Sequence, residues 1–139
     1  MSRSLIQTVN QSSQTVANNS IISLGSVLRR FGCNCRLSGN AIEVTGEGYY
    51  TIDADVTIMP SVAGIVTVAL LKNGAQIPSA IASGSVSTAG NPVTLCMNTT
   101  IRQACCCDSA DNITCVLTLP TGSDDTATVS NISVRVVKE

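Results

Sequence analysis

The feature that most constrains the fold is a strict alternation of apolar and polar residues from Tyr49 to Met59. Side chains of a β-strand point alternately to its two faces, so this alternation is typical of a strand with one buried face. The sequence therefore predicts a sheet that packs on a core with one side only. The side chains expected to face the core are Tyr50, Ile52, Ala54, Val56 and Ile58, and those expected to face outward are Tyr49, Thr51, Asp53, Asp55 and Thr57.

A β-hairpin is predicted shortly after this strand. The segment from Gly64 to Leu71 is apolar on both faces, and it is followed by Lys72, Asn73 and Gly74. Asn-Gly is a strong hairpin signal, because both residues tolerate the positive φ of a type I′ turn. We therefore expect two antiparallel strands that meet at this turn.

Further short strands are expected along the chain, separated by clusters of turn-forming residues. No window shows the 3.6-residue apolar period of a helix. Short strands at regular spacing are typical of a β-sandwich or jelly roll. We therefore predict an all-β jelly-roll sandwich of about eight to ten strands with essentially no helix. The further expected strands are Ile21 to Leu28, Ala41 to Val44, Ile81 to Val86, Val93 to Met97, Ile101 to Ala104, Ile113 to Leu119 and Thr126 to Val137.

One domain is expected, preceded by a polar arm. The 139 residues suffice for a single hydrophobic core. Residues 1–14 are rich in Ser, Gln, Asn and Thr, so we interpret them as an N-terminal arm that is either frayed or paired with a neighbouring subunit. The jelly-roll domain is expected to span residues 15–139.

Charged residues are scarce in this chain. They make up 12% of it, against about 25% in an average soluble protein, so we expect part of the uncharged surface to be buried between subunits. The net charge of −1, without any Lys/Arg-rich stretch, argues against nucleic acid and membrane surfaces as partners. The start of the chain lacks the apolar region of a secretory signal, so we expect synthesis in the cytoplasm.

The residue types needed for most enzyme mechanisms are missing. The chain has no histidine, which removes the usual general base and the common nucleophile pairs. We interpret Asp53 and Asp55 as solvated carboxylates, because nothing in the sequence indicates a cleft between them. The sequence therefore predicts no enzyme and no cofactor. The one metal alternative is a calcium ion in oxygen-rich loops, for which the weak candidates are Asp108, Asp111, Asp124 and Asp125.

The seven cysteines form two clusters and two single residues. The clusters are candidates for disulfides or cross-links between subunits, and the single residues, Cys96 and Cys115, are expected to be buried thiols in strands. Zinc and a redox site are weaker alternatives, because the spacing fits neither the usual zinc pairs nor a Cys-x-x-Cys motif. The clustered cysteines are Cys33, Cys35, Cys105, Cys106 and Cys107.

Three segments carry a resemblance to a known family, namely residues 46–56 with a Gly-x-Tyr strand opening, residues 66–78 with the Asn-Gly turn, and the closing strand at 129–137. They resemble the tumour-necrosis-factor-like jelly roll of bacterial and phage surface proteins. Segments 29–33 and 102–106 are similar to small proteins of Firmicutes and their prophages. The resemblance covers about residues 15–139 and implies a threefold trimer that is joined through apolar sheet faces. Because this fold serves many functions, it does not by itself define one.

The first functional hypothesis is a structural virion protein, a homotrimeric capsid decoration or head-fibre protein on the phage surface. Its partners would be further copies of itself, a capsid protein and possible host surface glycans. One alternative is a spore-surface or appendage subunit whose filaments are linked by disulfides. A further alternative is a carbohydrate-binding module, which the absence of Trp disfavours. Interface candidates are Arg29, Arg30, Tyr49 and Arg102.

Overall fold

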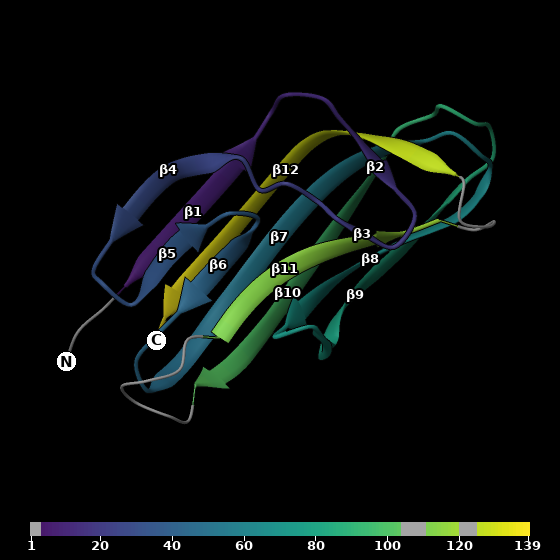
Figure 1. Cartoon of the computed structure of the whole chain (residues 1–139). Coiled ribbons are helices and arrows are strands. Elements are labelled where there is room, and N and C mark those ends of the chain that lie inside the picture. Colours follow the sequence, from purple (N-terminus) through teal and green to yellow (C-terminus); the bar gives the residue numbers. More distant parts are fainter. Residues whose placement is uncertain (1–3, 104–110, 120–124) are drawn as a thin grey trace.

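The computed structural model describes residues 4–103, 111–119 and 125–139, and in them the chain folds as a sandwich of two antiparallel sheets. Figure 1 shows the two layers and places the start of the first strand and the C-terminus at the same end of the molecule. Sheet A has the order β10 (Val93–Gln103), β7 (Gly48–Pro60), β12 (Thr126–Lys138), β1 (Leu5–Asn10) and β4 (Ser26–Phe31), and β2 (Gln14–Ala17) pairs with the start of β12.

Sheet B forms the second layer, and its strands come from the stretches of chain between those of sheet A. Its order is β5 (Cys35–Ser38), β6 (Ala41–Val44), β11 (Asp111–Thr118), β8 (Gly64–Lys72) and β9 (Ala75–Val86), with β3 (Ser20–Ile21) paired to β11. The described residues hold no helix that could cross a membrane. The all-β jelly-roll prediction is confirmed, although the described strands number twelve and not eight to ten.

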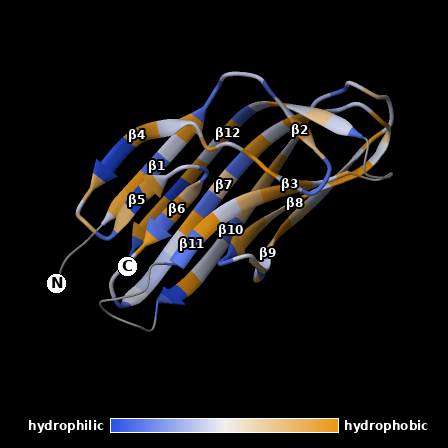
Figure 2. Cartoon of the chain, in the orientation of Figure 1, coloured by the Kyte–Doolittle hydropathy of each residue, from blue (hydrophilic) through white to orange (hydrophobic). Residues whose placement is uncertain are grey.

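The core lies between the sheets and is built from the alternating residues of each strand. Tyr50, Ile52 and Val56 of β7 are fully buried, as the alternation predicted. Each Val, Leu or Ile side chain that is buried in this way stabilises the fold by about 1.5–3 kcal/mol. Figure 2 shows the same alternation of hydrophobic and hydrophilic residues along the long strands.

The predicted hairpin is confirmed at the end of β8. Asn73 and Gly74 have φ values of 54° and 86°, and β9 begins at the next residue. Two positive φ values in succession are those of a type I′ turn, whose twist matches the right-handed twist of the flanking strands.

The structure differs from the prediction at the N-terminus. Residues 5–10, which we expected to belong to a separate polar arm, form β1 between β12 and β4. Ile6 and Thr8 of this strand are fully buried. The polar composition concealed the strand, because only Ile6 supplies an apolar side chain to the core side of its central part.

Two further predicted strands have different bounds. The expected strand from Ile21 to Leu28 is divided into β3 and β4, because Gly25 between them adopts a φ of +79° that strands do not use. The segments Val93 to Met97 and Ile101 to Ala104, which we expected to be separate, lie in the continuous strand β10, apart from Ala104, which lies outside the described residues.

Candidate interaction surfaces

The outer face of sheet A is a broad surface on which side chains from different strands form rows. Arg29, Gln7, Arg135, Asp53 and Asn98 form one such row across β4, β1, β12, β7 and β10. The row is set by strand register, because directly paired residues of antiparallel strands point to the same face. The sheet thus presents a surface formed by five strands.

Many polar side chains of this face are bonded to one another. Thr57 Oγ1 lies 3.1 Å from Thr94 Oγ1, and Gln7 Nε2 donates to Ser133 Oγ at 3.5 Å. Asp53 accepts a hydrogen bond from Asn98 and lies 3.7 Å from Arg135 Nη1. Because burial of a polar group costs least when it is hydrogen-bonded, this face is suited to contact with another protein.

Two of the interface candidates lie together at one end of this face. The guanidinium carbon of Arg102 lies 6.0 Å from the centroid of the Tyr49 ring, which is the limit of a cation–π contact. Both residues are exposed. Sequence reasoning named each of them singly, whereas their pairing depends on the register of β7 and β10.

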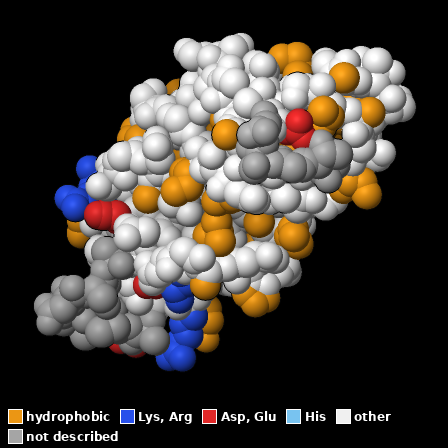
Figure 3. Space-filling model, turned by 45° about the vertical axis from the view of Figure 1, so that its right-hand side comes forward, with side chains coloured by type: hydrophobic (Ala, Val, Ile, Leu, Met, Phe, Trp, Pro, Cys, Tyr) orange, Lys and Arg blue, Asp and Glu red, His pale blue; other side chains and the backbone are white. Residues whose placement is uncertain are grey.

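The outer face of sheet B carries a band of apolar side chains. Ile21, Val116, Ala69 and Ile81 are directly paired across β3, β11, β8 and β9. Ile21 and Ile81 are about half exposed. The sequence analysis did not predict this band. Its signal was the segment 64–71, which is apolar on both faces and so places apolar side chains on the outer face of the sheet. In the view of Figure 3, hydrophobic side chains are scattered among uncharged polar ones, and most charged side chains lie toward one end.

The edge strand β4 brings the two remaining interface candidates to the rim of sheet A. Arg29 and Arg30 are both exposed. Arg29 lies in the outer-face row, whereas the Nε of Arg30 donates to the carbonyl oxygen of Cys35 at 2.9 Å. That bond joins β4 to the edge strand of sheet B and fixes the position of the Arg30 guanidinium.

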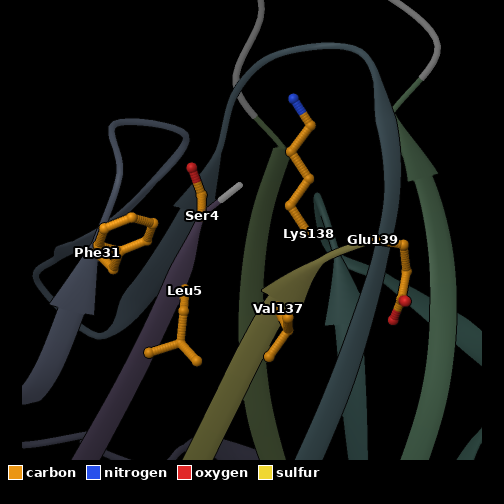
Figure 4. Close-up of a pocket in the computed structure, with 6 residues that line it drawn as sticks. All are labelled: Ser4, Leu5, Phe31, Val137, Lys138 and Glu139. Atoms are coloured by element: carbon orange, nitrogen blue, oxygen red, sulfur yellow. The ribbon is translucent and has the colours of Figure 1, made fainter. Parts of the chain in front are cut away.

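A hollow of about 460 Å³ lies where β4, β1 and β12 come together. Figure 4 shows Leu5, Phe31 and Val137 around it, with the Lys138 and Glu139 side chains beyond them. The three apolar residues lie in one row across these strands. The hollow has an apolar floor, and Ser4, Lys138 and Glu139 add polar and charged groups to its lining.

The cysteines occupy three kinds of environment. Cys33 is exposed in the turn before β5, while Cys35 and Cys115 are buried. Burial raises the pKa of Cys35 from 9.0 to about 11 against the opposing effect of Arg30 and Lys138, and burial raises the pKa of Cys115 to about 12. The cluster Cys105, Cys106 and Cys107 lies outside the described residues.

The prediction for Cys96 is wrong. Its side chain is exposed on the outer face of sheet A, because Leu95 and Met97 on either side of it face the core. A hydrogen bond to Asp55, its partner across β7, raises the pKa of the Cys96 thiol, and the negative charge of that carboxylate acts in the same direction.

Among the calcium candidates, Asp108 and Asp124 lie outside the described residues. Asp111 is buried, and its carboxylate contacts Lys72 and Asn73 at 3.4 and 2.8 Å. Within the described parts of the chain, no three His, Cys, Asp or Glu side chains gather as metal ligands do. The Asp111 carboxylate therefore acts as a partner for a lysine and an amide in the structure.

The sequence matches no protein-family model and no curated protein. Solved structures share its fold over almost the whole chain. Murine APRIL superposes with a TM-score of 0.70 at 14% identity, covering 99% of this chain and 100% of that one. The globular domain of zebrafish complement 1qA protein has a TM-score of 0.70 at 7% identity, with coverages of 99% and 97%.

A phage protein is also among the similar structures. The PRD1 vertex protein P5 superposes with a TM-score of 0.64 at 13% identity and covers 97% of this chain and 96% of its own. Together these likenesses define the fold class of the protein, a jelly roll like those of these three structures. At such identities they define the fold alone.

Proposed function

We propose that this chain is a structural protein of a phage particle, which assembles as a homotrimer and decorates the capsid or forms a short head fibre. The observation that carries the proposal is the full-length likeness to the PRD1 vertex protein P5. The sequence resemblance to tumour-necrosis-factor-like phage surface proteins points in the same direction and supplies the expectation of threefold symmetry.

The outer face of sheet A is the proposed contact between copies. Its central polar side chains are already bonded to one another, as in the pairs Thr57–Thr94 and Gln7–Ser133, so their burial leaves few unsatisfied groups. Apolar area is supplied at one end by Leu5 and Val137. Residues of both kinds on one broad face are typical of protein interfaces, which are mixed in polarity.

Light scattering of the purified full-length chain tests this proposal. The expected mass is about three times the 14.3 kDa of one chain. Thr57→Arg places a long charged side chain in the middle of the proposed contact and is expected to give monomers. Thr67→Arg is the matched control, because Thr67 forms a similar bond with Ser83 at 3.0 Å on the outer face of sheet B.

The alternative outcomes separate the possibilities. A monomeric wild-type chain contradicts self-assembly. If trimers persist in the Thr57→Arg variant but dissociate in the Thr67→Arg variant, the outer face of sheet A is not the contact between copies. The contact is then assigned to sheet B. Binding of the trimer to capsids that lack it, followed by electron microscopy, then tests the position on the particle.

A second candidate function is a disulfide-linked subunit of a spore-surface or appendage filament. The observation that favours it is the exposure of Cys33 and Cys96 on the surface of the fold, where they are accessible to a neighbouring subunit. Long fibres that shorten when a reductant is added would support this candidate, whereas discrete particles that are indifferent to reductant would support the decoration protein.

A further inference from the structure

The edge strand β4 contains no proline, unlike β9, an edge strand on the opposite side of the sandwich. The proline of β9 is Pro78, which cannot donate a backbone hydrogen bond to a further strand. At the near side β4 pairs, among the described strands, with β1 alone. One row of β4 backbone groups therefore has no neighbouring strand within the part of the chain that the structure describes.

The exposed side chains of β4 are typical of a strand that pairs with a further strand. All of its residues are exposed, including Val27 at 41%, Leu28 at 53% and Phe31 at 66%. Protected sheet edges usually carry charges, proline or a bulge in place of large apolar side chains. β4 has a bulge opposite Gln7 and Thr8 and carries two arginines, yet it also retains three large apolar side chains on its surface.

The charges of β4 decide which neighbour fits. Arg29 and Arg30 are adjacent on the strand, and the described residues include no acidic group in an ion pair with either. A second copy of β4, paired antiparallel, would bring four arginines into one short ladder, and like charges that face each other across strands destabilise pairing. An acidic segment would instead form charge-assisted bonds with both guanidiniums.

We propose that β4 is a docking edge for an extended acidic segment of a partner protein, which adds to sheet A as a further strand. The segment has two adjacent acidic residues opposite Arg29 and Arg30, flanked by apolar residues opposite Val27, Leu28 and Phe31. Backbone hydrogen bonds supply affinity and the side-chain pairs supply specificity, as in other cases of strand addition. This inference goes beyond the proposed function and does not require it.

The experiment uses the full-length protein and a short fluorescent peptide in which two adjacent glutamates are flanked by valines. Fluorescence anisotropy measures binding, and amide hydrogen exchange measures the protection of Ser26–Phe31. A second peptide has the same charge but has proline in place of the valines next to the glutamates, so that it cannot pair as a strand. We expect binding and slower exchange of β4 with the first peptide only.

Matched protein variants test the role of charge. Arg29→Glu is expected to weaken binding of the valine peptide by about tenfold or more. Arg102→Glu makes the same change of charge on β10, the opposite edge strand of the same sheet, and is expected to leave binding nearly unchanged. The mass of the assembly is recorded for each variant, so that a failure of peptide binding is distinguished from a failure of trimer formation.

Three results would overturn the inference. The first is the absence of binding, or equal binding of the valine and proline peptides, because either excludes strand addition. The second is an equal loss with Arg29→Glu and Arg102→Glu, which would indicate attraction by net charge alone. The third is protection of β4 amides that rises with protein concentration in the absence of peptide, which would assign the edge to a second copy of this chain.

Discussion

The side-chain amide of Asn73 ties the β8–β9 hairpin to the start of β11. Its Nδ2 donates to Asp111 Oδ1 at 2.8 Å, and its Oδ1 accepts from the backbone N–H of Asn112 at 2.9 Å. The backbone N–H of Asn73 also donates to the carbonyl oxygen of Asn112. Asn73 therefore adopts the positive φ that the turn requires and also donates a hydrogen bond to the buried Asp111 carboxylate.

Replacement of Asn73 by glycine removes its side chain and also raises the conformational entropy of the unfolded chain. Glycine tolerates the φ of 54°, so the change removes the two side-chain bonds without backbone strain. Asp111 is buried and loses a donor, so we expect the free energy of unfolding to fall by about 1–3 kcal/mol. Urea denaturation measures this change, and an unchanged midpoint would show that the amide bonds add nothing to stability.

Gly25 and Gly90 form a matched pair of left-handed glycines, with φ values of +79° and +87°. A Cβ on Gly25 would clash with the carbonyl oxygen of Val9, whereas a Cβ on Gly90 meets open space. Gly90→Ala should therefore cost only the backbone term of about 1–2 kcal/mol. Gly25→Ala should cost more than about 3 kcal/mol, because backbone atoms of β1 must also move. Equal midpoints of thermal unfolding for the two variants would contradict this explanation.

Alkylation by iodoacetamide at pH 8 should separate the described thiols. Cys33 is exposed and should react first, whereas Cys35 and Cys115 are buried with raised pKa values and should react only when the chain unfolds. Cys96 is exposed, but its hydrogen bond to Asp55 raises its pKa. Asp55→Asn should therefore accelerate labelling of Cys96 several-fold, as followed by peptide mass spectrometry, and leave the Cys33 rate as an internal control.

Stability should fall at alkaline pH because of the buried thiol of Cys115. Its pKa is raised from 9.0 to about 12 by burial, so above pH 9 the unfolded chain releases this proton while the folded chain retains it. The contribution of the protonated Cys115 thiol to the free energy of unfolding is fully present below pH 9. It is lost between pH 9 and 12, at up to about 1.4 kcal/mol per pH unit.

Urea titrations at pH 8, 9 and 10 check this prediction. Cys115→Ala removes the titrating group and should reduce the slope of stability against pH, although it also lowers stability at every pH through a small cavity. Cys33→Ala, which removes an exposed thiol, should keep the wild-type slope. Parallel slopes for wild type and Cys115→Ala would contradict the assignment.

Local patterns in the sequence were sufficient for much of the fold. The alternation from Tyr49 to Met59 predicted β7 and its buried face, and Asn73-Gly74 predicted the hairpin. Both predictions hold because they depend on short-range physics, namely the two-residue period of a strand and the φ preferences of a turn. The fold class followed from the spacing of such signals along the chain.

The surfaces were determined only by the tertiary structure. Cys96 was misassigned because an isolated cysteine in a strand does not reveal which face it occupies, and this depends on the side to which Leu95 and Met97 turn. Likewise, the sequence shows only that Arg29 and Arg30 are adjacent. They lie on an edge strand because β1 is placed between β4 and β12 in sheet A. Sequence alone determined the strands, because strand and turn preferences are local. Register and sheet order determined which side chains meet on the surface, because pairing joins residues far apart in the chain.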